Sequence, residues 1–134
     1  MRAIVNRLAA PGEMWGVRVW PDRAPANPVR PYALYFINSG GENNRVREAD
    51  AAFGVTIKCV ADTMAQSMQG AARLAELLND CGTQDIGDDP LDAGLDWVIT
   101  TITQGRLVHL VEDFGNVEPV YHDGHVFDFV MGRA

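Results

Sequence analysis

The stretch AAFGVTIKCVADTMAQSMQGAARLAELLNDCG, residues 51–82, contains the change of hydrophobic period that decides the fold class. Its first ten residues alternate between apolar side chains and small or polar ones. The apolar positions are Phe53, Val55, Ile57 and Cys59. Alternation with a period of two is typical of a β-strand with two unlike faces. The sequence therefore predicts a strand over residues 51–60.

The rest of this stretch changes to a period of three to four residues, which is typical of a helix. Thr63 and Gln66 have the spacing of a capping box at the N-terminus, and Gly82 is a common residue just beyond a C-terminus. The recurring apolar positions are Met64, Met68, Ala71, Ala72, Ala75 and Leu78. We expect this stripe to pack on a sheet, although the methionines could instead form an adaptable binding surface.

The N-terminal third predicts a short helix and two strands. Residues 1–10 place apolar side chains at helical spacing before a Pro-Gly pair ends the pattern. WGVRVW, residues 15–20, alternates like a strand. Four prolines in residues 21–31 predict an extended loop, because proline lacks a backbone donor and restricts φ. YALYFIN, residues 32–38, has almost no polar face and predicts a strand buried on both sides.

The C-terminal third predicts two or three further strands. They follow a polar break at residues 39–50 and an acidic, turn-rich loop at residues 83–94. The β-rich segments are residues 95–103, 106–113 and 125–131. Gly105 is either a tight turn or a bulge, and Asp123-Gly124 is a strong hairpin signal, so we expect HDGH to reverse the chain. The expected fold is α+β, one domain over residues 1–134, with a single mostly antiparallel sheet of about five to six strands and both helices packed on one face.

Composition excludes several classes of protein. The chain has 134 residues, 47% of them hydrophobic, which is too many for a disordered protein. Its formal charge of −7 argues against specific nucleic-acid binding, which needs clustered Lys and Arg. It has no apolar run long enough to cross a membrane and no signal-peptide pattern, so we expect a soluble cytosolic product. Cys59 and Cys81 lack CxxC spacing and predict buried or idle thiols.

His109, His122, Asp123 and His125 are the one grouping that could hold a metal or perform acid–base chemistry. A small metal-dependent hydrolase built on these residues is one hypothesis. However, side chains on opposite sides of a β-turn diverge, and the chain contains no nucleophile elbow, phosphate-binding loop or dinucleotide fingerprint. We therefore expect no enzyme activity, catalytic residue, metal site or cofactor.

The order of segments resembles the tail-terminator, or tail-completion, proteins of long-tailed bacteriophages. The resemblance spans nearly the whole chain and has no signature motif. It is carried by the short N-terminal helix, WGVRVWPDRAPANPVRPYALYF, the polar loop before FGVTIKCV, the AARLAELL helix, and the closing GRLVHLVED and PVYHDGHVFDFVM segments. It implies a virion protein that forms a ring, expected to be a hexamer, on the head-proximal end of the tail, and that lies in the host cytoplasm before assembly.

The resemblance also implies partners and an interface. Such a ring would stop polymerisation of the tail tube protein and join the tail to a head connector, adaptor or stopper protein, while DNA passes through its lumen. The polar loop at residues 39–50 corresponds to an arm that contacts neighbours or the tube. Large aromatic rings in the first third suggest further contact surface. The expected interface residues are Glu42, Arg45, Arg47, Glu48, Trp15 and Trp20.

Two other hypotheses remain beside the tail terminator and the hydrolase. Another neck or connector-adaptor protein would differ in the face that is bound. A small regulatory binding module would differ in its gene neighbourhood, since a terminator gene is expected among head and tail genes.

Overall fold

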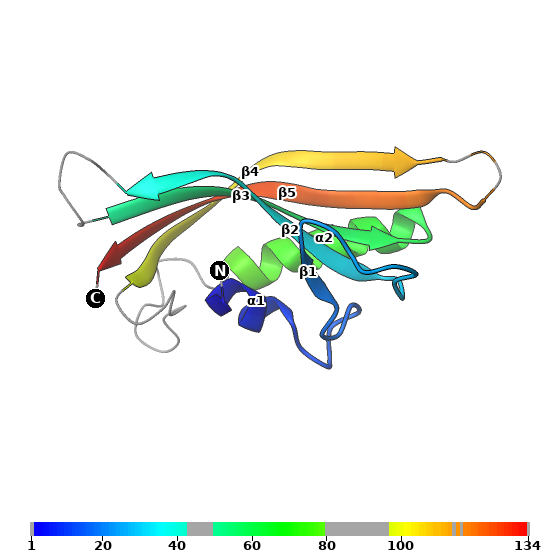
Figure 1. The fold of residues 1–134 in the computed structure, drawn as a ribbon, viewed down its shortest axis with the longest axis horizontal. Coiled ribbons are helices and arrows are strands. Elements are labelled where there is room, and N and C mark those ends of the chain that lie inside the picture. The colour runs from blue at the N-terminus through cyan, green and yellow to red at the C-terminus, as the bar shows by residue number, and fades with distance from the viewer. Residues whose placement is uncertain (1, 43–49, 80–96, 114, 116, 134) are drawn as a thin grey trace.

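An open sheet of five strands with two helices on one face forms the part of the chain that the structure describes (Figure 1). The computed structural model describes residues 2–42, 50–79, 97–113, 115 and 117–133. In chain order the elements are α1 Arg2–Leu8, β1 Val19–Pro21, β2 Tyr32–Glu42, β3 Asp50–Ala61, α2 Met64–Asn79, β4 Trp97–Glu112 and β5 Val120–Arg133.

The strands lie in the order β1-β2-β3-β5-β4, so β4 is one edge of the sheet and β1 the other. Only β1 and β2 pair in parallel among these strands, and the other three pairings are antiparallel. Because β3 and β4 are both antiparallel to β5, they run parallel to each other, with α2 as the crossover between them. This arrangement confirms the predicted α+β class and the mostly antiparallel sheet.

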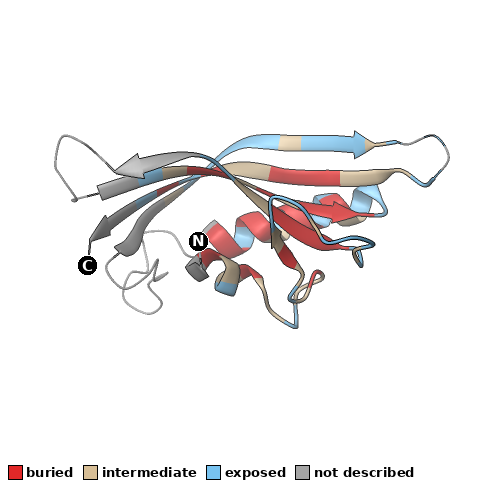
Figure 2. Ribbon diagram, viewed as in Figure 1, coloured by how far each residue is buried: buried red, intermediate tan, exposed pale blue. Residues whose placement is uncertain are grey.

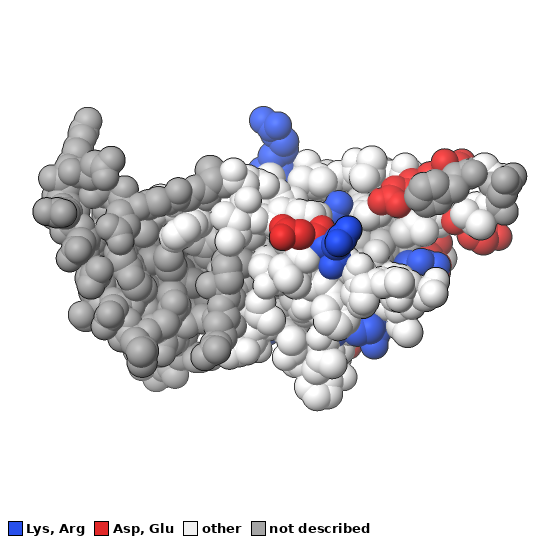
Figure 3. Space-filling view, viewed as in Figure 1, with Lys and Arg blue, Asp and Glu red and all other residues white. Residues whose placement is uncertain are grey.

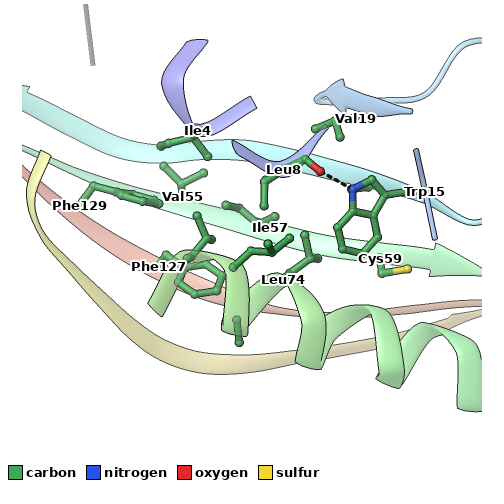
Figure 4. Close-up of a cluster of buried hydrophobic side chains, with 14 residues drawn as sticks. Ile4, Leu8, Trp15, Val19, Val55, Ile57, Cys59, Leu74, Phe127 and Phe129 are labelled. Carbon is green, nitrogen blue, oxygen red and sulfur yellow. Dashed lines mark hydrogen bonds between the residues drawn. The ribbon is translucent and has the colours of Figure 1, made fainter. Parts of the chain in front are cut away.

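The strand and helix predicted from residues 51–82 are both present. Val55, Ile57 and Cys59 of β3 are fully buried and face the helices, as the alternation predicts (Figure 4). The Gln66 amide donates a hydrogen bond of 3.2 Å to Thr63 Oγ1, which confirms the predicted cap of α2. Together with residues of α1 and β5 these side chains form one core between the helices and the sheet. Further core members are Ile4, Leu8, Trp15, Leu74, Leu78, Phe127 and Phe129.

The buried face of α2 differs from the predicted one. Met64 and Met68 are 49% and 54% exposed, so the expectation that both methionines pack on the sheet is wrong. The helix turns a face with small residues toward β3. A Cβ atom at Gly70 would lie 2.3 Å from Cys59 Sγ, so glycine is required for this close approach. Tight packing of α2 therefore leaves the two methionines in solvent.

The predicted strand at residues 15–20 is shorter than expected, because the chain turns at Gly16, whose φ is +58°, and β1 starts at Val19. Trp15 is fully buried, and its indole Nε1 donates a hydrogen bond of 2.7 Å to the carbonyl of Leu8. The turn is also tied to α2, since Arg73 donates two hydrogen bonds to the Glu13 carboxylate. These bonds lower the pKa of Glu13 below its ordinary value.

The other face of the sheet carries a second, smaller apolar cluster. Its buried members are Tyr32, Leu34 and Val60, and Trp20 and Phe36 pack against them. The start of β2 is thus buried on both sides, as predicted, but further along the strand Ile37 is more than half exposed. The proline-rich loop after β1 shares this face, because Ala24 packs against the same cluster.

The prediction that HDGH reverses the chain is wrong. Asp123 and Gly124 lie within β5 and pair with both β3 and β4. A Cβ atom at Gly124 would lie 2.1 Å from the carbonyl oxygen of Ile57, so glycine serves a close approach of strands and makes no turn. The reversal lies between β4 and β5, where the Gly115 amide donates to Asp113 Oδ1 at 2.9 Å. Gly105, which the sequence leaves open, lies in a bulge of β4.

Some predicted features lie outside the described residues. They are the acidic loop, Cys81, the helix stop at Gly82, and residues 43–49 of the predicted arm. The flanks of that arm belong to β2 and β3, which extend to Glu42 and begin at Asp50. Among the described helices none has the length and apolar character needed to cross a membrane.

Candidate assembly interface

Much of the edge strand β4 is exposed (Figure 2), and its exposed residues include apolar ones that point to both faces of the sheet. Leu107 and Val111 point to the helix face, because they pair with His125 and Tyr121 of β5. Leu110 points to the opposite face. Leu107 is 62% exposed, and the other two are more than 40% exposed. The helix α2 packs mainly on β3 and β5, which leaves these side chains of the outer strand uncovered. We call Leu107, Leu110 and Val111 the β4 edge patch.

This edge lacks most of the features that keep sheet edges from pairing. Soluble proteins usually protect an edge strand with lysines, prolines, bulges or a covering segment. The bulge in β4 and the charged residue within it, Arg106, both come before the patch. Residues 107–111 contain no Lys, Arg, Asp or Glu. In the described part of the chain no strand pairs with the outer side of β4. An apolar, unpaired edge of this kind is a surface suited to association.

Acidic residues mark the end of the hairpin that β4 forms with β5. Glu112, Asp113 and Glu118 lie at or beside the turn, and Figure 3 shows their end of the molecule as an acidic area. Val117, in the same turn, is 60% exposed. The edge patch therefore runs into a tip that is acidic and partly apolar.

The structure disagrees with part of the interface predicted from sequence. Trp15 belongs to the core, so its ring offers no surface to a partner. Trp20 is half-buried and packs on the open face of the sheet. Glu42 is the last residue of β2, and the position of its side chain lies outside what the structure describes. Arg45, Arg47 and Glu48 fall outside the described residues altogether.

Sequence reasoning missed the β4 edge patch, although a signal for it was present. RLVHLVE carries apolar residues at both odd and even positions, which usually indicates a strand buried on both faces. In an edge strand the same pattern leaves apolar side chains in solvent. The sequence does not show which strand lies at the edge. The pattern could therefore not be assigned to an exposed surface before the strand order was known.

The four residues of the hydrolase hypothesis are divided between the two faces of the sheet. On the helix face Asp123 is buried, accepts a hydrogen bond from Ser67 Oγ of α2, and lies 2.5 Å from His109 Nδ1 through its other oxygen. On the opposite face His122 Nε2 lies 2.8 Å from Glu112 Oε1, within ion-pair distance but without the alignment of a hydrogen bond. HDGH thus contributes two separate histidine–carboxylate contacts between β5 and β4.

Neither contact has the geometry of a catalytic or metal site. Ser67 is fully buried and bonded to a carboxylate, so it has no histidine base, which a serine nucleophile requires. Among the described residues no group of three His, Cys, Asp or Glu side chains could hold a metal ion. His125 stacks edge-on against Phe127 and contacts neither pair. The arrangement ties strands to each other and to α2.

The titration behaviour of these groups follows from burial. Burial lowers the pKa of His122, and the nearby Lys58 ammonium lowers it further. Burial alone lowers the pKa of His125. The Cys59 thiol has its pKa raised to about 12 by burial and by the charge of Asp123, so it stays protonated and unreactive, as predicted.

Comparison with known proteins finds likenesses of fold among solved structures. No protein-family model matches the sequence, and no curated protein matches it. A solved structure titled "Virion of native gene transfer agent (GTA) particle" contains a chain with a TM-score of 0.61. The match covers 98% of this chain and 93% of that chain, at 14% sequence identity. The likeness therefore includes the whole fold, and at this identity it is evidence for the fold alone.

Comparison and structure together give a fold shared with a chain of a virion particle and an exposed apolar sheet edge. A chain from a virion particle has this fold over nearly its full length. Among the described residues, the β4 edge patch is exposed and apolar.

Proposed function

We propose that this protein is a tail terminator, which forms a ring on the head-proximal end of a phage-type tail tube. The observation that carries the proposal is the β4 edge patch in a fold shared with a virion chain. The ring would stop tube polymerisation and join the tail to a head connector, adaptor or stopper protein. The chain itself performs no chemical reaction in this role.

The layout of the sheet suits contacts between unlike surfaces, which a closed ring requires. The β4 edge patch lies at one edge. Two further exposed apolar residues are Val17, two residues before β1, and Val29, three residues before β2. We propose that the edge patch of one copy packs against the β1 side of the next. A ring of six copies is the expected form.

The proposal also includes the interface residues that were predicted in and near the arm. Glu42, Arg45, Arg47 and Glu48 lie in or beside the segment between β2 and β3, and Trp20 is half-buried near β1. We propose that they contact the tube or a neighbouring copy. The charge of −7 is compatible with a lumen that repels DNA phosphates, so that a genome passes without binding.

Electron microscopy of the purified protein mixed with tail tubes tests the proposal. We expect rings in the free protein by native mass spectrometry, and density on one end of each tube with a halt in tube growth. Binding to DNA-filled heads with no binding to tubes would instead identify a neck adaptor. Absence of both rings and capped tubes would refute the tail-terminator function.

A further inference from the structure

A pocket of about 360 Å³ lies between the proline-rich loop and the open face of the sheet. Its wall includes Pro25 and Pro28, and its floor includes Phe36 of β2. This volume is at the small end of ligand sites, which are concave and mostly apolar with a few convergent polar groups. Tyr32, Leu34 and Phe36 of the second apolar cluster supply its apolar lining.

Three neighbouring strands each deliver one polar side chain to the floor of this pocket. They are Lys58 of β3, His122 of β5 and Glu112 of β4. All three point to the face opposite the helices, since Lys58 pairs with Gly124 and His122 pairs with Leu110. The glycine is required here, because a Cβ atom at Gly124 would lie 2.6 Å from Lys58 Cβ. The strand register thus aligns these polar groups along one diagonal.

Part of this polar set has no partner within the described chain. His122 is 96% buried, and its Nδ1 makes no hydrogen bond there, while Nε2 has only the poorly aligned contact with Glu112. The Lys58 ammonium lies over the Phe36 ring, 5.1 Å from its centroid. Buried polar groups normally have hydrogen-bond partners, so the unmet nitrogens of His122 require an explanation. Lys58 and Glu112 line the pocket beside His122 and can bond a ligand there.

The charges around the pocket restrict the class of ligand. Lys58 and Arg23 are balanced by Glu112 and Asp22, so the lining carries no net charge. A phosphate or carboxylate would lie beside Glu112, and an ammonium group beside Lys58. A peptide group avoids both conflicts, because its carbonyl accepts from Lys58 while its N–H donates to Glu112. Pro25 and Pro28 have no backbone donor, so this wall of the pocket suits an apolar side chain next to the bound peptide group.

We infer that this pocket binds an extended peptide segment of a partner protein, with an uncharged peptide group over Lys58 and Glu112 and an apolar side chain against the proline-rich loop. The site is built by a single chain, so binding does not require the ring. This goes beyond the proposed capping function and gives the protein a second contact surface, which lies beside Leu110 of the β4 edge patch.

Nuclear magnetic resonance titration of the full chain tests the inference. The probe is N-acetyl-leucine N-methylamide, which carries two uncharged amides and one apolar side chain, and acetate and inorganic phosphate are the comparison ligands. We expect saturable shifts of the Lys58 and His122 signals with the amide probe only. No shift up to the solubility limit of the probe would overturn the inference, and equal binding of acetate or phosphate would replace it with an anion site.

Matched variants assign the binding to these residues. Lys58→Met and Glu112→Gln each remove one hydrogen-bonding charge and should weaken the probe about tenfold, as expected for one lost charged hydrogen bond. Arg106→Met removes a positive charge outside the pocket lining and should leave affinity unchanged. If both pocket variants bind the probe as tightly as the wild type does, Lys58 and Glu112 do not form the binding site. The same titration in a Leu107→Lys/Val111→Lys background separates this result from any failure of ring formation.

Discussion

At the scale of single residues, Asp123 and Gly124 are neighbours with unrelated structural tasks. Asp123 points to the helix face, where it accepts a bond from Ser67 Oγ and contacts His109, and so links α2, β5 and β4. Gly124 points the other way and lets β5 approach β3 closely. A dipeptide that is usually a turn signal is therefore used here for packing on both faces of one strand.

Gly124→Ala should destabilise the protein by about 3 kcal/mol or prevent folding, because overpacking against a backbone oxygen cannot be relieved by a rotamer change. The clash is with the carbonyl of Ile57. Urea unfolding at 25 °C measures the change. Gly12→Ala is the matched control, since a Cβ atom there would meet nothing within 4 Å. Equal stability of the two variants would show that β5 and β3 are not in this register.

The buried His122 and the half-buried His125 should make stability depend on pH below about 6.5. Folding lowers the pKa of His122 and of His125, mainly through burial, so the unfolded chain binds protons more readily than the folded one. The free energy of unfolding should therefore fall as the pH falls through this range. Urea unfolding at about pH 7.5 and pH 5.5 measures the difference. The variant His122→Gln/His125→Gln should reduce it, and an unchanged difference would contradict this explanation.

At the scale of elements, β4 contrasts with the central strands. Val55 and Ile57 of β3 have no exposed surface, whereas β4 has neighbours on one side only. Apolar side chains in such a strand contribute little to the stability of the lone chain. Their contribution is available instead to an interface with another copy.

Leu107→Lys/Val111→Lys should abolish self-association and leave the stability of the single chain within about 0.5 kcal/mol of the wild type, because both side chains are exposed. Light scattering coupled to gel filtration measures the mass, and urea unfolding measures the stability. Met64→Lys/Met68→Lys is the control, with the same change of charge on α2. Loss of association in the control alone would move the interface from β4 to the helix.

At the scale of the whole molecule, an open sheet with two unlike edges is compatible with the proposed ring of a small acidic chain. The apolar core is covered on one face by two helices and in part on the other by the proline-rich loop. The exposed large apolar residues include the β4 edge patch at one edge and Met64 and Met68 on α2. The proposed ring would have to overcome the repulsion between copies that each carry a charge of −7.

Self-association should therefore strengthen as salt is raised from about 50 mM to 500 mM, because salt screens repulsion between like charges and leaves apolar contacts intact. Sedimentation velocity at the two salt concentrations measures the shift toward the larger species. The Leu107→Lys/Val111→Lys variant should stay monomeric at both. Weaker association of the wild type at high salt would indicate an interface held by ion pairs, such as one made by Arg45 and Arg47.

The sequence alone determined the type of most elements. Local periodicity predicted α1, β3 and α2, and local cap chemistry placed the start of α2 at Thr63. These features depend on side chains a few residues apart, which a single sequence displays directly. The α+β class follows from the same local patterns.

Only the tertiary structure decided which surfaces are buried and which are free. The turn signal at Asp123-Gly124 was overridden because β5 pairs along its length with two strands, and those backbone bonds outweigh a local preference. The burial of Trp15, the exposure of Met64 and the position of β4 at the edge depend on contacts between segments far apart in sequence. Strand order is set by packing of the whole chain, so the apolar residues of β4 could be identified as a surface only once their neighbours were known.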